Sequence, residues 1–278
     1  MRNILFVCSG NTCRSPLCEV LGNKLLPSFS FSSRALSGFS GDSASEGSID
    51  AAQRHSLDLS SHKSRVLSVE DIDKADEIIC MTESHKAILS NILERLSIKK
   101  DVTVLGGGIP DPFMGDSEVY ENCYNLIKNA IIFHFFGLEI APISKEDISY
   151  LHLLEVNIFS IPWSEQAFSE FLENENNFGL VAKKNGKIVG YITGSSVLGE
   201  AEIYNIAVTL EERGKGIGRL LLLEFEDRLT PKEIVLEVRK SNEGAIRLYE
   251  KLGYKTISER KNFYENPRED ALMMKKER

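Results

Sequence analysis

The sequence predicts two consecutive α/β domains, residues 1–138 with a doubly wound parallel sheet and residues 139–278 with a mixed sheet. In the first half, short apolar runs alternate with segments of helical period, and this order gives a parallel sheet covered by helices. In the second half, two neighbouring apolar runs are joined by Asn185-Gly186, which is a strong hairpin signal and indicates antiparallel pairs. The segment from Gly137 to Ser144 is the expected joint.

Apolar runs bounded by turn-forming residues predict the strands, and apolar residues at helical spacing predict the helices. In the first half we expect strands at 3–7, 29–34, 77–80 and 102–105, and helices at 17–26, 85–96 and 118–136. In the second half we expect helices at 145–155, 164–173 and 219–228, a hairpin of 180–183 with 188–193, and a strand at 201–208. Ligands bind at the carboxyl ends of parallel strands, so a site is expected after residue 7.

Composition narrows the class of protein. The 278 residues are enough for two ordinary domains, and 42% hydrophobic with 27% charged residues is typical of a soluble globular chain. The formal net charge of −8 argues against direct nucleic-acid binding, which needs a basic face. The most apolar stretch, residues 130–136, is interrupted by His134 and is far shorter than the roughly 20 residues of a membrane span. We therefore expect no membrane association and a cytoplasmic location.

The number and spacing of the cysteines narrow the class of protein further. The chain has five cysteines, all in the first half and without a CxxC pair: Cys8, Cys13, Cys18, Cys80 and Cys123. This pattern predicts neither a metal site nor a secreted disulfide framework.

The segment Cys8–Ser15 has the features of a phosphate-binding loop that carries its own nucleophile. It follows an apolar strand, and Pro16 is suited to the first position of a helix that begins there. Backbone N–H groups at a helix N-terminus attract an anion and also stabilise a thiolate at Cys8. Arg14 has the planar fork that binds two phosphoryl oxygens. The alternative is a buried cysteine at a strand end followed by an exposed helical arginine.

Three further motifs accompany this loop in order: Ala75-Asp76, Met81-Thr82 and Asp111-Pro112-Phe113. Together they resemble the low-molecular-weight protein tyrosine phosphatase family over residues 1–137. The resemblance implies that Cys8 attacks phosphorus to form a phosphocysteine, which water then hydrolyses. It implies that Asp111 protonates the leaving group and later deprotonates the water, without a metal.

The same resemblance assigns substrate-site roles to Asn11, Thr12 and Ser15. Ser15 would donate a hydrogen bond towards Cys8, and Asn11 tolerates the left-handed backbone that such a loop needs. Tyrosine-specific members usually have a bulky aliphatic residue at the position of Thr12, whereas the protein arginine phosphatases of this family have threonine. The segment Phe113-Met114-Gly115 also lacks the paired aromatic residues of many tyrosine-specific members. We expect phosphoarginine as substrate, with phosphotyrosine as the alternative.

Three further points concern Phe39, Cys80 and Cys13. Phe39 is a candidate wall of the substrate pocket. Arsenate reductases share the loop but need a cysteine pair about seven residues apart, and Cys80 has no such partner, so that activity is not expected. Cys13 either forms a reversible protective disulfide with Cys8 or is a small packed side chain.

The second half contains a glycine-rich loop, Arg213–Gly218, between a strand and a helix. Such a loop at a helix N-terminus can hold an anion, although alone it can also be a tight turn. With residues 236–242 and 245–254, it resembles the GNAT acetyltransferases, and within them the ribosomal-protein-alanine N-acetyltransferase group. Residues 159–165 and 268–271 also fit this group, and the resemblance extends over about residues 140–278.

The resemblance implies direct transfer of acetyl from acetyl-CoA to a protein N-terminus, in that group ribosomal protein S18. The cofactor-binding residues that it implies are Ile206, Ala207, Val208, Arg213, Gly214, Lys215, Gly216, Ile217, Gly218, Arg219 and Asn242. Glu237 would be the base, acting through water, and Tyr249 the acid that protonates the CoA thiolate. Without the resemblance, Glu237 would be interpreted as a surface residue of a strand and Tyr249 as a core residue of a helix.

We therefore expect a bifunctional enzyme, because matched catalytic residues are present in both halves. Its partners would be phosphorylated proteins and the S18 N-terminus. The alternative is a protein tyrosine phosphatase fused to a GNAT acetyltransferase of other amine specificity. Nothing in the sequence indicates that the two activities share a substrate.

Overall fold

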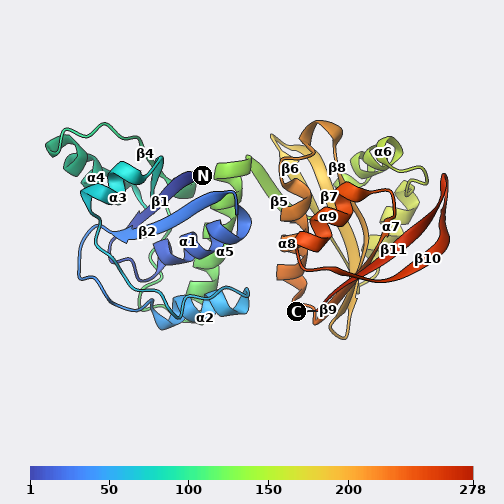
Figure 1. The fold of residues 1–278 in the computed structure, drawn as a ribbon, viewed down its shortest axis with the longest axis horizontal. Helices are drawn as coiled ribbons and strands as arrows, with labels where there is room; N and C mark the ends of the chain where they lie inside the picture. Colours follow the sequence, from blue (N-terminus) through green and yellow to red (C-terminus); the bar gives the residue numbers. More distant parts are fainter. Residues whose placement is uncertain (278) are drawn as a thin grey trace. The chain divides into compact units, whose positions relative to one another are not determined.

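The computed structural model describes residues 1–277 and divides into a compact first unit, Met1–Gly137, and a second that begins at Leu138 (Figure 1). Within the described part of the chain, no helix combines the length and the apolar character needed to cross a membrane. Both units combine helices with one sheet, as the sequence predicts.

The first unit contains a four-stranded parallel sheet in the order β2-β1-β3-β4. Its strands are β1 (Arg2–Cys8), β2 (Phe29–Ala35), β3 (Glu77–Cys80) and β4 (Val102–Val104). All four strands overlap the segments expected from the apolar runs. Cys8 is the last residue of β1, so it lies at the carboxyl edge of the sheet, as expected.

The helices of the first unit are α1 (Arg14–Leu25), α2 (Glu46–Arg54), α3 (Val69–Lys74), α4 (Glu83–Arg95) and α5 (Ser117–Phe136). The prediction that α1 begins at Pro16 is wrong, because the helix starts at Arg14. Proline is tolerated there because the N–H groups of the whole first turn lack helical partners. The helices α2 and α3 were not predicted, because they are short, although Ser45 and Ser68 cap them in the usual way.

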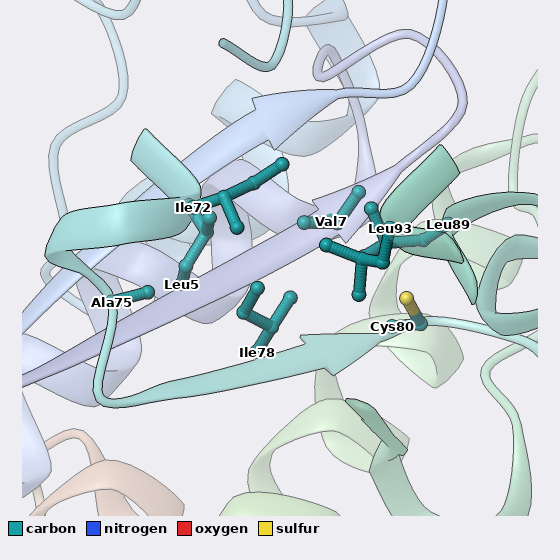
Figure 2. Close-up of a cluster of buried hydrophobic side chains, with 8 residues drawn as sticks. All are labelled: Leu5, Val7, Ile72, Ala75, Ile78, Cys80, Leu89 and Leu93. Atoms are coloured by element: carbon teal, nitrogen blue, oxygen red, sulfur yellow. The ribbon is translucent and has the colours of Figure 1, made fainter. Parts of the chain in front are cut away.

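Helices cover both faces of this sheet. On one face, Leu5 and Val7 of β1 pack with Ile78 and Cys80 of β3 and with α3 and α4 (Figure 2). The alternate residue Phe6 points to the other face, where it stacks on Phe31 of β2 at 5.8 Å between ring centroids. Phe135 of α5 packs edge-on against Phe31. The period of two along β1 therefore gives a sheet buried on both sides, the doubly wound arrangement that was predicted.

The second unit contains a seven-stranded mixed sheet in the order β10-β11-β9-β8-β7-β6-β5. Its strands are β5 (Leu138–Pro142), β6 (Asn177–Lys184), β7 (Lys187–Val197), β8 (Glu200–Val208), β9 (Glu233–Arg239), β10 (Lys255–Glu265) and β11 (Arg268–Glu277). The expected hairpin is confirmed, and both residues of its Asn185-Gly186 turn have positive φ. The expected joint is wrong in extent. Only Gly137, at φ 65°, separates α5 from β5, which pairs with β6 as an edge strand.

The helices of this unit are α6 (Ile148–Ile158), α7 (Glu165–Glu173), α8 (Ile217–Leu229) and α9 (Glu243–Lys251). The helix expected from residue 145 begins at Ile148, after a single 3₁₀ turn. Tyr191 of β7 packs in a cluster with residues of α6 and α7. The preceding residue, Gly190, faces Leu221 of α8. Helices therefore cover both faces of this sheet as well (Figure 1).

Strands β8 and β9 pair for only part of their length. They are parallel over Glu200–Ile203 and Glu233–Leu236, and their pairing stops there. On its other side, β8 pairs with β7 as far as Val208. Tyr204 is an extra residue in this pairing, because its neighbours Ile203 and Asn205 pair with consecutive residues of β7. Such a bulge bends and twists a strand. As a result, the chain from Asn205 to Val208 and that from Glu237 to Arg239 form the two arms of a split in the sheet.

Candidate functional sites

The first candidate site is the loop between β1 and α1. Cys8 is only 3% exposed, and its sulfur lies 3.0 Å from Oγ of Ser15. The backbone N–H of Asn11 donates to the same sulfur over 3.2 Å. The loop ends at the N-terminus of α1, where unpaired N–H groups and the helix dipole stabilise negative charge. The surroundings of Cys8 therefore favour the binding of an anion beside its sulfur.

Asn11 fixes the shape of this loop. Its φ of 55° is in the left-handed region, as expected for a residue that must tolerate this backbone. Its side-chain amide donates to Oγ of Ser15 over 2.9 Å and to Oγ of Ser33 over 2.8 Å. Its side-chain oxygen accepts from the backbone N–H of Arg65 over 3.0 Å. Asn11 thus holds three segments of the chain around the loop.

Arg14 lies beside Asp111. The Nη2 atom of Arg14 lies 2.6 Å from Oδ2 of Asp111, and Nη1 donates to the carbonyl of Ile109 over 3.0 Å. The Arg14 side chain is only 5% exposed, whereas that of Asp111 is 49% exposed. The alternative of an exposed helical arginine is therefore wrong. A buried guanidinium and a half-exposed carboxyl lie together beside the loop.

Two histidines that no sequence motif indicates support the loop. His62 donates from Nε2 to the carbonyl of Asn11 over 2.8 Å. His85 lies 2.8 Å from the hydroxyl of Ser9 through Nε2 and 2.9 Å from the hydroxyl of Thr82 through Nδ1. Burial, reinforced by the positive charge of Arg14, lowers the pKa of His85, so its ring is held neutral. No local spacing reveals the contacts of His62 with Asn11 and of His85 with Ser9, because they join residues distant in the sequence.

Thr12 and Cys13 also belong to this loop, and Phe39 and Phe113 are candidate residues outside it. The hydroxyl of Thr12 lies 3.7 Å from the sulfur of Cys13, which in turn lies 3.9 Å from the hydroxyl of Tyr120. Phe39 and Phe113 are 83% and 66% exposed. Neither side chain is packed in the core, so both remain accessible to a ligand.

The five cysteines are all free thiols in the structure. Burial raises the pKa of Cys80 and of Cys123 to about 12. Burial also raises the pKa of Cys18 far above its ordinary value. These three side chains therefore remain protonated thiols and are poor nucleophiles. The proposed disulfide between Cys8 and Cys13 stays a prediction.

The second candidate site lies at the split between β8 and β9. Among residues 1–277, no strand pairs with the arm from Ile206 to Val208 on the side of β9, so its backbone can pair with an extended ligand. The glycine-rich loop follows, with Gly214 at φ 75° and Gly216 at φ 87°. Gly216 caps α8, whose N-terminal residues are Ile217 and Gly218. This arrangement can bind a ligand with a linear arm and a phosphate end.

Three cationic side chains belong to the glycine-rich loop and the first turn of α8. Arg213 donates from Nε to the carbonyl of Val208 over 3.1 Å, which ties the loop to the end of β8. Lys215 is exposed and lies 3.2 Å from the carboxylate of Glu212. Burial lowers the pKa of Arg219, which lies in the first turn of α8.

The other arm of the split carries Glu237, the first β9 residue beyond the pairing with β8. Its carboxylate accepts a hydrogen bond from Arg260 of β10. Tyr249 of α9 is only 4% exposed, and burial, with a smaller effect of Tyr264, raises its pKa. Burial and then the charge of Glu237 raise the pKa of Tyr264. A carboxylate and a phenol that stays protonated therefore both lie near Tyr264.

Asn242 has a structural contact at the start of α9. Its side-chain oxygen accepts from the backbone N–H of Ala245 over 3.2 Å, which is a helix N-cap. Its side-chain amide nitrogen can donate the hydrogen bond to a cofactor that the resemblance implies.

Comparison with known proteins assigns the two halves of the chain to two different families. The family model described as low molecular weight phosphotyrosine protein phosphatase matches residues 3–142. The model of the acetyltransferase (GNAT) family matches residues 148–254.

Individual relatives each match about half of the chain. The low molecular weight protein-tyrosine-phosphatase PtpB of Staphylococcus epidermidis is 37% identical over 46% of this chain and 93% of its own. The ribosomal protein bS18-alanine N-acetyltransferase of Escherichia coli is 34% identical over 49% of this chain and 94% of its own. The solved structure of the YwlE arginine phosphatase from Geobacillus stearothermophilus is 34% identical over 47% of this chain and 88% of its own, with a TM-score of 0.43.

Proposed function

Because this chain belongs to the low molecular weight phosphotyrosine protein phosphatase family in its first half and to the GNAT acetyltransferase family in its second, we propose that it is a bifunctional enzyme. The first half removes phosphate from arginine residues of proteins. The second transfers acetyl from acetyl-CoA to the N-terminal alanine of ribosomal protein S18.

The observation that carries the phosphatase proposal is the position of Arg14 and Asp111 beside the Cys8 loop. In the first step, the sulfur of Cys8 forms a bond to phosphorus while the bond to the leaving group breaks. Asp111 gives its proton to that leaving group, and Arg14 binds two phosphoryl oxygens. In the second step, Asp111 takes a proton from water, whose oxygen displaces the sulfur and releases phosphate.

Thr12 supports phosphoarginine as the substrate. Its hydroxyl lies in the loop between Asn11 and Cys13, where a bulky aliphatic residue would present only carbon atoms. Its oxygen can therefore orient the polar phosphoramidate of phosphoarginine. Phosphotyrosine remains the second candidate substrate, because the relative PtpB is described as a tyrosine phosphatase.

The test compares phosphate release from matched phosphoarginine and phosphotyrosine peptides. We expect the unmodified protein to prefer phosphoarginine, Cys8→Ser to abolish release from both, and Thr12→Ile to shift the preference towards phosphotyrosine. A preference of the unmodified protein for phosphotyrosine contradicts the arginine assignment. Loss of both activities with Cys8→Ser would then still support the phosphatase.

The acetyltransferase proposal rests on the split between β8 and β9 and the glycine-rich loop after it. The pantetheine arm of acetyl-CoA would pair with Ile206 to Val208, and its pyrophosphate would lie at the N-terminus of α8. Glu237 removes a proton from the incoming ammonium through water, and the amine nitrogen then attacks the carbonyl carbon. The C–S bond breaks, and Tyr249 gives a proton to the departing thiolate. The nitrogen loses its second proton to water as the amide forms, and Tyr249 regains a proton from water.

Acetylation of a peptide with the S18 N-terminal sequence tests this assignment. We expect transfer to fall by about 10²-fold or more with Glu237→Gln or with Tyr249→Phe. The Cys8→Ser protein should retain full transfer, because Cys8 lies in the other unit. Equal transfer to peptides with unrelated first residues would contradict alanine specificity and leave a GNAT enzyme of other amine specificity.

A further inference from the structure

His85 connects the Cys8 loop to the start of α4, and the proposed phosphatase chemistry gives its ring no role. The residue is buried, with only 6% of its surface exposed. Its Nε2 atom lies 2.8 Å from the hydroxyl of Ser9, and its Nδ1 atom lies 2.9 Å from the hydroxyl of Thr82. Thr82 caps α4, and its hydroxyl also accepts from the backbone N–H of His85 over 3.3 Å.

Ser9 is the residue that follows Cys8, and it is held on two sides. Its carbonyl accepts from the backbone N–H of Ser37 over 3.1 Å, and its hydroxyl contacts the ring of His85. The backbone N–H groups of this loop and of the start of α1 are the groups that would bind a phosphoryl anion. A change in the charge of His85 therefore acts one hydrogen bond away from the residue next to Cys8.

The hydrogen bonds of His85 suit a neutral ring and a charged ring equally well. A neutral imidazole offers one donor and one acceptor, whereas a charged one offers two donors. Both partners are hydroxyl groups, which can donate or accept, so Ser9 and Thr82 satisfy either state by rotation of a hydrogen. When Thr82 accepts from the ring, it can donate to the hydroxyl of Ser84, which lies 2.9 Å away. The ring can therefore gain a proton without any movement of heavy atoms.

In the free protein, the surroundings of His85 oppose a charged ring. Burial and, less strongly, the positive charge of Arg14 lower its pKa, while Asp111 acts in the opposite direction. His85 is the third residue of α4, so the positive end of the helix dipole also disfavours a charged ring. The titratable and charged groups around it are Arg14 on α1, Asp111 before α5, Cys8 in the loop, and Glu83 and Lys86 on α4.

A phosphoryl dianion in the loop would reverse this balance. Arg14 would bind its oxygens, and two negative charges favour a positive ring nearby. We propose that His85 is a positioning residue of the phosphatase, which takes up a proton from water when a phosphoryl dianion binds beside Cys8 and, through Ser9, holds that dianion in the loop. The proton returns to water when phosphate leaves. This inference rests on the proposed phosphatase function.

Proton uptake by His85 makes the affinity for the dianion depend on pH. Because coupling is reciprocal, the factor by which the dianion tightens proton binding is the factor by which the proton tightens dianion binding. The affinity should therefore rise as the pH falls through the pKa of His85 in the complex. It should level off below the pKa in the free protein, which lies under the ordinary value of 6.5. A ring that only supports the shape of the loop would give no such dependence.

Sulfate is the probe, because it stays a dianion over this pH range and cannot be hydrolysed by the enzyme. The experiment follows the ring C–H signals of the five histidines of the full-length protein by nuclear magnetic resonance, with and without saturating sulfate. His85→Gln identifies the signal of His85 by its loss. We expect the pKa of His85 to rise by about one pH unit or more when sulfate is bound.

The affinity for sulfate supplies a second readout, measured in Cys8→Ser protein so that no thiol titrates in the loop. We expect the affinity to rise about tenfold between about pH 8 and about pH 6, and to rise several-fold less when His85→Gln is added. The amide nitrogen of this glutamine can still donate to Ser9, but it cannot gain a proton. The matched control is His134→Gln, which removes a histidine that pairs with Glu77 at the amino edge of the sheet. It should keep the full pH dependence.

Kinetics with a phosphorylated peptide supply the third readout. For His85→Gln we expect the KM to rise about fivefold at about pH 6 and to stay unchanged at about pH 8, while kcat changes by less than about twofold. A far-ultraviolet circular dichroism spectrum confirms that each variant is folded.

Three results would overturn the inference. The first is a pKa of His85 that is the same with and without sulfate, and the second is a pH dependence of sulfate affinity that His85→Gln leaves unchanged. The third is a KM that His85→Gln does not raise at the lower pH. Absence of phosphate release from any phosphopeptide by the unmodified protein contradicts the proposed function instead. In that case the sulfate measurements, which need no catalysis, still decide whether His85 takes up a proton with the dianion.

Discussion

Arg14 and Asp111 are 97 residues apart in the sequence, yet their side chains form an ion pair of 2.6 Å beside the Cys8 loop. The guanidinium is buried and the carboxyl is half-exposed, so the carboxyl can reach a bound substrate while Arg14 holds it. The pair also places the proposed acid next to the group that binds the phosphoryl oxygens.

Asp111→Asn should therefore lower phosphatase kcat by about 10² to 10⁴-fold on peptide substrates, because an amide cannot supply the proton. The loss should be smaller for an aryl phosphate with an acidic leaving group, which departs without protonation. Steady-state kinetics on both substrates check this.

Asp116→Asn is the matched control for Asp111→Asn. Asp116 caps α5 in the same stretch of chain, and asparagine caps a helix equally well. Equal loss on both substrates, or equal loss in the control, would contradict the role of Asp111 as proton donor.

Asn11 should contribute strongly to the stability of the first unit. Asn11→Ala leaves the backbone N–H of Arg65 without its partner. It also places alanine, which tolerates a left-handed backbone poorly, at φ 55°. The expected loss in the free energy of unfolding is about 2–4 kcal/mol. Asn11→Gly loses the same hydrogen bonds without the strain of a Cβ atom, so it should be about 1 kcal/mol less destabilising. Urea unfolding monitored by phosphatase activity measures both, and equal losses would show that backbone strain is unimportant.

Gly214 should matter for cofactor binding because of its backbone. Gly214→Ala adds strain of about 1–2 kcal/mol at φ 75°, in a loop that would enclose the pyrophosphate of acetyl-CoA. We expect a several-fold rise in the KM for acetyl-CoA. Gly186→Ala is a matched control in the β6–β7 turn, where φ is 76° and an added Cβ also meets no atom within 4 Å. It should cost similar stability and leave that KM unchanged.

Glu155 should make the stability of the second unit fall as the pH rises. Burial raises its pKa in the folded state to about 7, above the ordinary value of 4.5 that applies when the chain is unfolded. Its contribution to stability is fully present below pH 4.5 and is lost as the pH rises through about 7. The difference corresponds to about 3 kcal/mol between these limits.

Denaturant unfolding followed by Trp163 fluorescence at several pH values measures this slope. In Glu155→Gln the slope should be smaller by that amount. An unchanged slope would show that Glu155 does not titrate in this range.

The sequence predicts most of the regular structure that depends on local pattern. The strands β1, β3 and β8 follow from apolar runs, and α4, α5 and α8 follow from helical periodicity. The strand β10 was missed because nearly all its side chains are exposed, so no alternation of apolar and polar residues marks it. The edge strand β5 lies within the segment expected as the joint, because it is too short for its pattern to distinguish it from a linker.

Some residues of the candidate sites also follow from local sequence pattern, and others do not. The loop Cys8–Ser15 and the loop Arg213–Gly218 are contiguous in the sequence, so local pattern, together with the motifs that accompany each loop, predicts both as candidate sites. The supporting histidines, His62 and His85, contact the first loop from distant segments. Glu155 was missed because a carboxyl on an apolar helix face has no meaning until its partners are known.

The sequence by itself therefore determined the two domains and the contiguous loops that carry the proposed chemistry, because short-range pattern specifies secondary structure and phosphate-binding turns. The tertiary structure decided what lies against these loops. It set the ion pair of Arg14 with Asp111, the split between β8 and β9, and the binding of Glu155 to Tyr191 and Asn205, which are 36 and 50 residues away. These contacts depend on strand order, a bulge and burial, and the packing of distant segments sets all three.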